Sequence, residues 1–471
     1  MRKRLMLSLG TVLLTSTPFQ ATAQTTNTVG LWLTTADRSS LFAEQSPTLS
    51  FHKRNTDLPT IEVNDKVHFQ QMDGFGFALT GGSAELLMRM TPASRTALLK
   101  ELFTTNGSSI GVSYLRVSIG ASDMNERVFT YDDLPSGKQD PNLEHFDLGP
   151  DRADVVPVLR EILAINPSIT ILGSPWSPPS WMKTNDAAKA GSLRPEDYAV
   201  YAQYFVKYIQ AMAAEGIHID AVTVQNEPLN PKNTPSLFMP AHEEGEFIKS
   251  ALGPAFQAAG IHTKIFLYDH NCDKPEYPLE ILADPKANPY VAGSAFHLYG
   301  GQVSAMTQVH NAYPQKNVYF TEQMVIENEK GTPFKIQEPV SRVVIGATTN
   351  WSRNVLLWNL AADPQNGPHT ADGGCPICQG AITLDGDTVT RNLAFYTIAH
   401  ASKFVRPGSV RIESIAPANP ELAQVAFETP EHRTVLLVAN KAAKSYSFNV
   451  LFKGKEFSTT LAPGAVGTYV W

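Results

Sequence analysis

The sequence predicts an α/β protein in which a (β/α)8 TIM barrel carries a β-sandwich domain formed from both termini. Three observations predict this class. Short apolar runs alternate with helix-like stretches eight times between residues 68 and 404, which is typical of βα units. The two flanks of this region are rich in β-forming residues. No G-x-G-x-x-G motif follows an early strand, so an open doubly wound sheet, the second possibility, lacks its main support.

The barrel strands are expected at short, mostly apolar runs. These runs are residues 72–79, 113–119, 169–174, 221–225, 264–268, 293–297, 316–320 and 354–357. Helical patterns lie between them, for example at residues 195–214, where aromatic residues recur with helical spacing. Eight such units over this length suit a barrel with insertions.

The sandwich is expected to take strands from both flanks. The candidates are residues 29–34 and 60–63 before the barrel, and residues 410–414, 435–439, 445–452 and 467–471 after it. Neither flank can bury a core by itself, so the two should pair into one sandwich packed on the barrel. The expected division is residues 24–67 and 405–471 for the sandwich and residues 68–404 for the barrel.

Residues 1–23 have the three parts of an export signal. A basic stretch at residues 2–4 precedes an apolar run at residues 5–14, and residues 21–23 read Ala-Thr-Ala, a cleavage site of small residues. The apolar run is too short to span a bilayer, which takes about 20 residues. We therefore expect the mature chain to begin near Gln24 and to be exported, to the periplasm or the medium, without stable membrane insertion.

Composition and charge restrict the possible partners. The chain has 471 residues, of which 43% are hydrophobic, and a net charge of −7. These values exclude a disordered or coiled-coil protein. No long basic run occurs outside the extreme N-terminus, so nucleic acid and anionic membranes are poor partners. A neutral or polymeric substrate fits better.

The three cysteines favour one disulfide. An exported chain permits disulfides, and Cys375 and Cys378 can close a short loop bridge that leaves Cys272 unpaired. A zinc site would need two further ligands, and neither a second C-x-x-C nor a spaced histidine pair follows. We favour the loop disulfide over a metal or redox site, and no metal is expected.

Two glutamates directly follow predicted barrel strands. Glu227 stands after the fourth strand in Gln225-Asn-Glu-Pro228, and Glu322 after the seventh in Tyr319-Phe-Thr-Glu322. The C-terminal ends of the strands carry the catalytic groups of (β/α)8 barrels. Glycoside hydrolysis needs two carboxyl groups in one cleft, one protonated and one ionised. Either glutamate alone would suit a surface loop, but the pair predicts an active site.

Other strand ends supply groups suited to sugar binding. Aromatic rings stack on the apolar face of a pyranose, and carboxylate, amide and imidazole groups bond its hydroxyls. The candidate substrate ligands are Arg116, Asp123, Trp176, Asn226, His297, Tyr299 and Trp358. Arg116 has a second interpretation, as a partner that keeps Glu322 ionised. We interpret Trp181 as structural.

Two other hydrolase signatures are present only in part. Residues 107–111 fit G-x-S-x-G, but the nucleophile elbow needs a strand before it and a helix after it, and here the order is reversed. Residues 242–246 have Glu246 where H-E-x-x-H needs its second histidine. A non-catalytic carbohydrate-binding protein would keep Trp176 and Trp358 but would not need both glutamates. An enzyme is therefore favoured.

The ordered set of motifs resembles glycoside hydrolase family 30, the glucosylceramidase and β-1,6-glucanase family. The motifs lie at residues 73–76, 115–117, 123, 174–176, 226–228, 296–299, 321–322, 358–360 and 402–404. The resemblance implies a retaining mechanism with Glu227 as acid/base and Glu322 as nucleophile. It also implies that Asp123 and Trp176 bind a glucosyl unit in the −1 subsite. This chemistry needs no cofactor.

Two features of the sequence bear on the part of the substrate beyond that glucosyl unit. Glucosylceramidases of the lysosomal type continue the first motif with Thr-Asp, whereas Thr80 here is followed by Gly81-Gly-Ser83. The mouth loops at residues 230–235 and 363–367 are polar and proline-rich, whereas a lipid-handling enzyme should present an apolar rim. We expect β-1,6-glucan as substrate, with glucosylceramide as the alternative. A related xyloside, fucoside or galactoside comes third.

Overall fold

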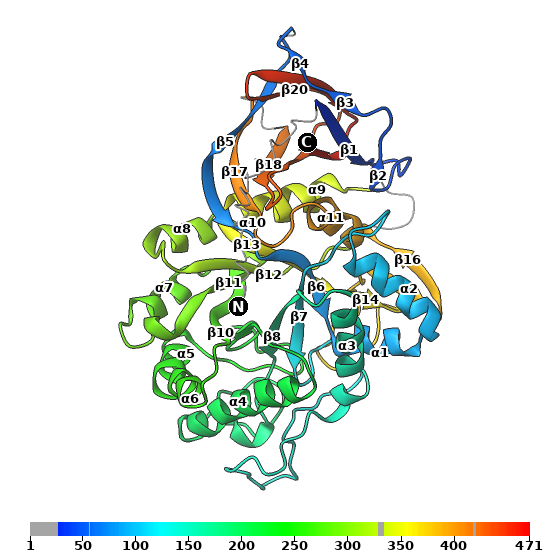
Figure 1. Cartoon of the computed structure of the whole chain (residues 1–471). Coiled ribbons are helices and arrows are strands. Elements are labelled where there is room, and N and C mark those ends of the chain that lie inside the picture. Colours follow the sequence, from blue (N-terminus) through cyan, green and yellow to red (C-terminus); the bar gives the residue numbers. More distant parts are fainter. Residues whose placement is uncertain (1–26, 56, 328–333, 418–420) are drawn as a thin grey trace, which may run out of the picture.

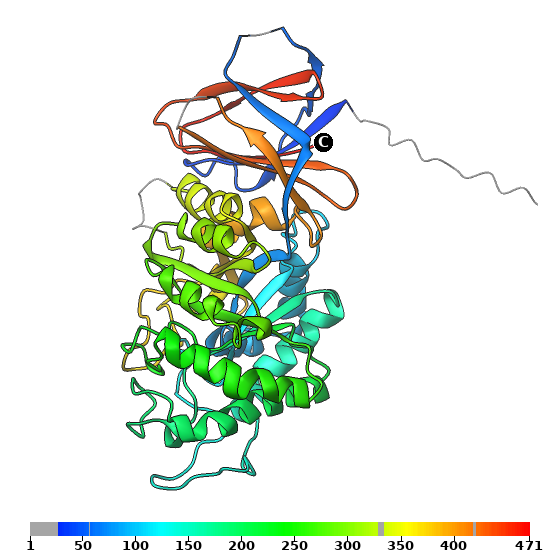
Figure 2. The ribbon, with the colours of Figure 1, turned by 90° about the vertical axis from the view of Figure 1, so that its left-hand side faces the viewer.

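The computed structural model describes residues 27–471 apart from residues 56, 328–333 and 418–420. The predicted export signal at residues 1–23 lies outside the described residues. Figure 1 shows a β-rich unit stacked on a larger barrel, and Figure 2 shows the same arrangement from the side. Among the helices of the described part, none has the length and apolarity required to cross a membrane.

Eight parallel strands close into a barrel and confirm the predicted fold class. They are β6 (Gly74–Leu79), β7 (Tyr114–Ile119), β8 (Thr170–Pro175), β9 (Ala221–Thr223), β10 (Lys264–Cys272), β11 (Val291–Gly301), β12 (Asn317–Glu322) and β13 (Ser352–Asn359). Each pairs with the next, and β13 closes on β6. All eight predicted strands are present. Strands β10 and β11 run further than expected because their hydrogen bonding continues past the apolar run into polar residues.

The barrel interior is filled below the mouth. One side chain from each of seven strands meets there: Tyr114, Leu172, Ala221, Phe266, Ala295, Tyr319 and Leu356. The rings of Phe266 and Tyr319 stack with their centroids 3.8 Å apart. This packed layer of side chains fills the barrel interior. The functional groups therefore lie above it, at the C-terminal ends of the strands.

Helices surround the barrel. The α-helices are α1 (Gly81–Arg89), α2 (Pro92–Phe103), α3 (Val155–Ile165), α4 (Tyr198–Ala214), α5 (Ala241–Phe247), α6 (Gly253–Ala258), α7 (Glu276–Ala283), α8 (Ala305–Ala312), α9 (Gln337–Pro339), α10 (Gly346–Thr349) and α11 (Leu393–Ser402). Shorter 3-10 turns are η1 (Gly149–Arg152), η2 (Ser180–Met182), η3 (Pro195–Asp197) and η5 (Asn288–Tyr290), and π-helical turns are η4 (Ile248–Leu252) and η6 (Val340–Ile345). Helix α4 matches the predicted aromatic pattern: its tyrosines are buried, and the chain turns away at Gly216, whose φ of +81° favours glycine.

The sandwich strands come from both ends of the chain, as predicted. They are β1 (Thr28–Thr34), β2 (Ala43–Glu44), β3 (Leu49–Ser50), β4 (His52–Lys53), β5 (Thr60–Gln71), β17 (Val410–Ile415), β18 (Leu422–Glu428), β19 (Thr434–Asn440), β20 (Tyr446–Phe452), β21 (Lys455–Leu461) and β22 (Val466–Val470). Strand β1 pairs with β22, and β5 lies between β17 and β20. The long strand β5 then leads down into the barrel, as Figure 1 shows. Strands β2–β4, β18 and β21 were not predicted. Strands β2–β4 have only two residues each and β21 carries few apolar residues, whereas β18 is largely apolar and was missed.

The central sandwich strands bury both of their faces. In β19, Val435 and Leu437 belong to the same core cluster as the barrel, whereas Leu436 and Val438 belong to the core of the sandwich. The imidazole of His400 in α11 hydrogen-bonds the hydroxyls of Thr34 and Thr468, each at 2.8 Å. The barrel and the sandwich therefore share one continuous packed interface.

A small third sheet follows the last barrel strand. It consists of β14 (Ala361–Ala362), β15 (Ile382–Asp385) and β16 (Thr388–Arg391), and it was not predicted. Its strands bring the two ends of the intervening loop, residues 363–381, close together. This segment carries Cys375 and Cys378, and we call it the disulfide loop.

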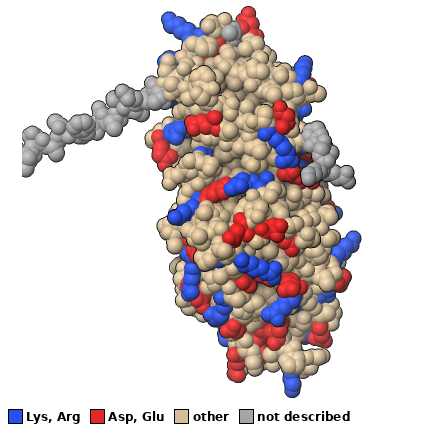
Figure 3. All heavy atoms as spheres, turned by 90° about the vertical axis from the view of Figure 1, so that its right-hand side faces the viewer, with Lys and Arg blue, Asp and Glu red and all other residues tan. Residues whose placement is uncertain are grey.

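Charged side chains of both signs are mixed on at least one face of the molecule. Figure 3 shows one face, on which Lys and Arg alternate with Asp and Glu over the sandwich and the barrel. Such a mixed surface agrees with the small net charge of −7 and gives this face no field of one sign.

Candidate active site

A cleft of about 560 Å³ opens at the C-terminal ends of the barrel strands. It gathers most of the predicted site residues, which come from six different strand ends. Those lining it are Asp123, Trp176, Asn226, Glu227, Tyr299, Glu322 and Trp358. Residues far apart in the sequence therefore form one site, as the strand-end rule predicts.

Glu322 is anchored through both of its oxygens. The guanidinium of Arg116 donates to Oε2 at 2.6 Å, and the hydroxyl of Tyr299 donates to Oε1 at 3.0 Å. Burial raises the pKa of Glu322, although the charges of His297 and Arg116 act in the opposite direction. A carboxylate fixed in this way at the base of a cleft suits nucleophilic attack.

Glu227 lies opposite Glu322 and has different contacts. Its Oε1 is 3.1 Å from Nδ1 of His297, and its Oε2 accepts a hydrogen bond from the amide of Asn230 at 2.7 Å. Burial alone would raise the pKa of Glu227, but the hydrogen bond and charge of His297, with His270 and Asn230, lower it to about 2. The Glu227 backbone has a φ of +45°, in the left-handed region where non-glycine residues are uncommon outside functional sites.

The two glutamates are close to each other. A carboxylate oxygen of Glu227, one of Glu322 and a ring nitrogen of His297 all lie within 4.8 Å of one another. Retaining glycosidases place their carboxyl groups about 5–5.5 Å apart and inverting ones about 6.5–9.5 Å apart. The observed proximity fits the retaining arrangement.

Arg116 and His297 were also expected to bind substrate, but neither is among the residues that line the cleft. Both side chains are 0% exposed and lie behind the cleft wall. Arg116 instead pairs with Glu322 and Asp269, which is its second interpretation, and His297 bridges Glu227 and Asp269. The sequence shows that a residue lies at a strand end, but it does not show whether neighbouring side chains bury that residue.

Asp269 is the centre of this buried network and was missed in the sequence. Its Oδ1 accepts from His297 and Thr321, and its Oδ2 accepts from Arg116, Ser174 and Thr223, all at 2.6–3.0 Å. Burial raises the pKa of Asp269, but Arg116 and these donors bring it well below its usual range. A β-bulge at residues 268–270 of β10, where Tyr268 and Asp269 have positive φ, turns the carboxylate inward. The sequence signal that could have identified Asp269 is the polar run at residues 269–271, directly after the predicted fifth strand.

The side of the cleft that carries Asp123 and Trp176 contains buried polar atoms without a partner among the described residues. Oδ1 of Asp123 and Nε1 of Trp176 are buried and make no hydrogen bond to the described residues. Burial, followed by the charges of Glu322 and Glu227, raises the pKa of Asp123 to about 8. The rings of Trp176 and Trp358 lie 5.4 Å apart at 31° and form an angled wall. These are the groups that the hydroxyls and the apolar face of a sugar would satisfy.

The side chain of Asn226 is also oriented to hydrogen-bond a ligand in the cleft. Its Oδ1 accepts from Arg116 Nη2 at 2.6 Å, so its NH2 group is the part left to donate to a ligand. Asn226 lines the cleft next to Glu227.

The glycine pair at residues 81–82 positions Asp123. Helix α1 starts there, capped by Thr80, and the segment that follows Asp123 packs directly on it. A Cβ at Gly81 would lie 1.9 Å from the Asn125 amide, and one at Gly82 would lie 2.6 Å from the Met124 carbonyl oxygen. This departure from the lysosomal motif therefore has a packing reason.

The disulfide loop forms another part of the cleft wall. The structure joins Cys375 to Cys378, and Cys272 is buried and free. Cys378 packs in one cluster with Trp176 and Trp358, and the backbone N–H of Thr370 bonds the Asp123 carbonyl at 2.9 Å. The loop thus packs on the side of the site that carries Asp123 and Trp176.

The rim beside Glu227 consists of part of the predicted mouth loop at residues 230–235 and of residues at the end of β10 that were not predicted. The rim residues are Asn230, Pro231, Lys232 and Asn233 after β9, and His270, Asn271, Asp273 and Lys274 at the end of β10. The composition of the four residues at the end of β10 is typical of any polar surface segment, so no sequence signal sets them apart.

Two groups of described residues bring three possible metal ligands together. In Glu227, His297 and Glu322, the ring nitrogens already bond carboxylates, as an acid–base site requires. The other group is Asp132, Asp140 and His145, in the loop after β7. There, Asp140 accepts hydrogen bonds from both the ring and the backbone N–H of His145, at 2.8 Å.

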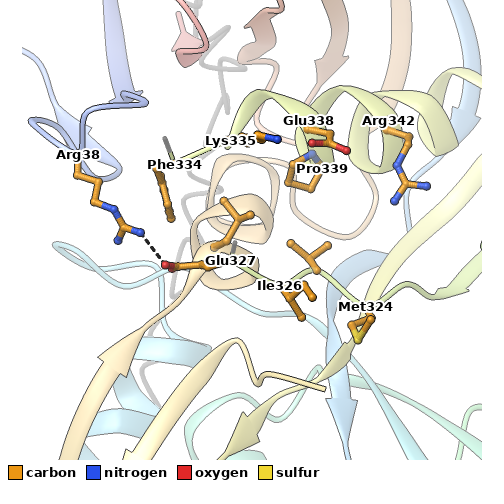
Figure 4. A pocket seen from close by; sticks show the side chains of 11 residues that line it. Arg38, Met324, Ile326, Glu327, Phe334, Lys335, Glu338, Pro339 and Arg342 are labelled. Atoms are coloured by element: carbon orange, nitrogen blue, oxygen red, sulfur yellow. Dashed lines mark hydrogen bonds and ion pairs between the residues drawn. The ribbon is translucent and has the colours of Figure 1, made fainter. Parts of the chain in front are cut away.

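A smaller hollow of about 200 Å³ lies beside the segment that follows β12. Figure 4 shows Arg38, from the loop after β1, pointing at Glu327. The two side chains form an ion pair at 2.6 Å, and the Arg38 guanidinium lies 4.2 Å from the centre of the Phe334 ring. This contact ties the chain just beyond Glu322 to the sandwich.

Comparison with known proteins agrees with this geometry. Residues 72–405 match the model described as the glycosyl hydrolase family 30 TIM-barrel domain, and residues 408–469 match its beta sandwich domain. An endo-1,6-beta-D-glucanase of Neurospora crassa is 38% identical over 362 residues, 74% of each chain. The lysosomal acid glucosylceramidase of Mus musculus is 29% identical over 86% of this chain and 81% of that one. The solved endo-beta1,6-glucanase BT3312 superposes with a TM-score of 0.86 at 36% identity, over 94% of this chain and 99% of that one.

Proposed function

The chain belongs to glycosyl hydrolase family 30, and from that premise we propose that it hydrolyses β-1,6-linked glucan with retention of anomeric configuration. The observation that carries the mechanism is the pair of buried carboxyl groups, Glu227 and Glu322, with oxygens within 4.8 Å of each other in one cleft. Retention needs this spacing, because the nucleophile must reach the anomeric carbon while the acid reaches the leaving oxygen.

In the first step, Glu322 attacks the anomeric carbon. The bond to the leaving oxygen breaks as Glu227 supplies it with a proton, and the glucosyl unit becomes an ester of Glu322. The bonds from Arg116 and Tyr299 hold the attacking carboxylate in place. In the second step, Glu227 takes a proton from water, the resulting hydroxide attacks the anomeric carbon, and Glu322 leaves as a carboxylate.

The rim of the cleft supports a saccharide rather than a lipid as leaving group. Among the described residues, the large apolar side chains that are exposed are Val67, Phe238, Tyr299, Ile377 and Ile415, and of these Tyr299 alone lines the cleft. The remainder of the rim beside Glu227 is largely amide and charged groups. Relatives named as endo-1,6-glucanases support the same choice, and the more distant glucosylceramidase keeps glucosylceramide as the second candidate.

Export belongs to the same proposal. The basic, apolar and small-residue segments of residues 1–23 support a cleaved signal. Expression of the full chain followed by N-terminal sequencing of the product should give a start near Gln24.

A product analysis with two substrates tests the function. We expect the protein to release glucose or gluco-oligosaccharides from β-1,6-glucan, and proton NMR should show the β-anomer as the first product. The Glu322→Gln variant, which keeps the shape of the side chain, should release none. Appearance of the α-anomer first would contradict retention. Glucose released from glucosylceramide alone would overturn the choice of glucan and leave the glutamate pair unaffected.

A further inference from the structure

We propose that His297 holds the acid proton in the free enzyme and passes it to Glu227 as the glycosidic bond breaks. This inference deepens the proposed function and rests on it. His297 does not touch the substrate, since its side chain is 0% exposed, so it is a positioning residue that acts through Glu227.

The hydrogen bonds of Asp269 determine the protonation of Nε2 of His297. Five donors surround this carboxylate: Arg116, Ser174, Thr223, Thr321 and His297. The Arg116 guanidinium is a permanent cation 2.7 Å from Oδ2, and together with the other donors it keeps Asp269 ionised. Nε2 of His297, at 3.0 Å from Oδ1, must therefore carry a hydrogen.

The other half of the ring faces a second carboxyl group. Nδ1 lies 3.1 Å from Oε1 of Glu227. Two oxygen or nitrogen lone pairs cannot face each other in a buried contact, so one proton must lie in this bond, on Nδ1 or on Oε1. His297 and Glu227 thus share one acid proton, whichever atom holds it.

The surrounding charges place that proton on the ring in the free enzyme. The carboxylates of Glu227, Asp269 and Glu322 favour an imidazolium, and the Glu322 oxygen lies 4.0 Å from Nδ1. His270 from β10, and Arg116 beyond Asp269, act against it. Tyr299 and Asp123 face Glu322 from β11 and the β7 loop. Burial lowers the pKa of His297, but the carboxylates raise it to about 9 overall.

The transfer conserves protons over the catalytic cycle. As the glycosidic bond breaks, the Nδ1–H bond breaks, Oε1 of Glu227 takes the proton, and the leaving oxygen receives it as a new hydroxyl. His297 is then neutral, with its remaining hydrogen on Nε2. In the second step the proton taken from water returns through Oε1 to Nδ1. The pair is therefore ready for another substrate without exchange with bulk solvent.

Leaving-group dependence combined with pH tests the proposal in the whole enzyme. Wild type and His297→Gln are compared on a β-1,6-gluco-oligosaccharide, which needs a proton, and on 2,4-dinitrophenyl β-glucoside, which does not. The ratio of the two kcat/KM values cancels titrations common to both substrates. We expect His297→Gln to lower this ratio about 100-fold and to move its alkaline decline to lower pH by about one unit. Hydrolysis of the dinitrophenyl substrate should change by less than about threefold.

His400→Gln is the matched control. His400 is also fully buried, but its partners are the hydroxyls of Thr34 and Thr468 rather than carboxylates. This variant should lower the thermal midpoint and leave the ratio and its pH dependence unchanged. If His297→Gln lowered kcat/KM equally on both substrates and did not shift the alkaline decline, His297 would have a purely structural role. That result would overturn the inference.

A direct measurement on the wild type covers the case in which His297→Gln does not fold. In nitrogen-15 NMR of histidine-labelled enzyme, one ring should be doubly protonated at pH 8 and should shift when a 2-fluoroglucosyl group is trapped on Glu322. A neutral ring at that pH would overturn the inference. If the wild type hydrolyses neither substrate, the proposed function itself has failed, which is a different outcome.

Discussion

At the scale of single residues, the contacts of the two glutamates differ, and so should the chemistry that rescues their loss. Glu322, the proposed nucleophile, is held by two donors, whereas Glu227, the proposed acid/base, contacts His297 and Asn230 on the side of the polar rim. Removal of either side chain opens a space for a small anion on a different face of the sugar. The anomer formed in that space reports the role of the missing residue.

Rescue by azide should therefore separate the two roles. Glu322→Gly should be inactive and should form α-glucosyl azide from dinitrophenyl β-glucoside, because azide replaces the nucleophile. Glu227→Ala should form β-glucosyl azide and should lose about 10²–10⁴-fold on substrates with poor leaving groups only. Proton NMR of the azide products checks both, and the opposite pattern would reverse the two roles.

Asp123 should act as a neutral acid. Its pKa is raised to about 8 by burial and then by Glu322 and Glu227, so the carboxyl is mostly protonated at pH 7. Activity of the wild type on dinitrophenyl β-glucoside should fall as pH rises through 8, where a third negative charge forms. Asp123→Asn is neutral at every pH and keeps a donor and an acceptor. It should retain kcat/KM within about tenfold at pH 6 and lack the decline near pH 8.

The same titration predicts how Asp123 affects stability. The folded-state pKa is raised, so its contribution is fully present below the unfolded value of about 3.9 and is lost as pH rises through 8. The difference in thermal midpoint between Asp123→Asn and wild type should therefore grow in favour of the variant from pH 5 to pH 9. A difference that is constant with pH would contradict a protonated Asp123.

At the scale of elements, loops and a bulge decide which groups face the cleft. The bulge in β10 turns Asp269 inward, and α1 packs its two glycines against the segment that bears Asp123. Cys378 of the disulfide loop packs in one cluster with Trp176 and Trp358. The bulge, the glycine pair and the disulfide loop each fix the position of a side chain at the active site. A regular strand or an open loop would place that side chain differently.

Removal of the disulfide should affect binding more than stability. The bridge closes a loop of few residues, so it restricts the unfolded chain little and contributes about 2 kcal/mol or less. Because Cys378 packs on the tryptophan wall, the Cys375→Ala, Cys378→Ala double variant should raise KM for glucan about fivefold with little change in kcat.

The matched control lies in the same loop. Ile377 is 58% exposed and does not line the cleft, so Ile377→Ser should leave KM unchanged. Steady-state kinetics and a thermal melt measure both variants. A large loss of thermal stability with an unchanged KM in the double variant would contradict a role of the loop at the site.

At the scale of the whole molecule, the barrel and the sandwich bury a common core. Strand β19 directs alternate side chains to the barrel and to the sandwich, and His400 joins α11 to β1 and β22. The segment after Glu322 is also held to the sandwich through Arg38 and Glu327. The sandwich is therefore part of the structural support of the active site.

A pair of neighbouring substitutions tests this coupling. Leu437→Ala removes a side chain that faces the barrel, and Leu436→Ala removes one that faces the sandwich core. Each should lower the free energy of unfolding by about 2–5 kcal/mol, because each leaves a buried cavity. Calorimetry should show one unfolding transition in both variants. Two separated transitions in Leu437→Ala would show that the two parts unfold independently.

The sequence by itself determined the eight barrel strands, the contribution of both termini to the sandwich, and the two glutamates. The spacing of apolar residues and the position at which a strand ends can be read from a short stretch of sequence. Because the barrel is closed, the C-terminal ends of all eight strands lie close together around one mouth. Only the tertiary structure decided that Arg116 and His297 are fully buried, that Asp269 joins them, and that the disulfide loop packs on Trp176 and Trp358. Burial and the direction of a side chain depend on bulges and on neighbours distant in sequence, which no local pattern records.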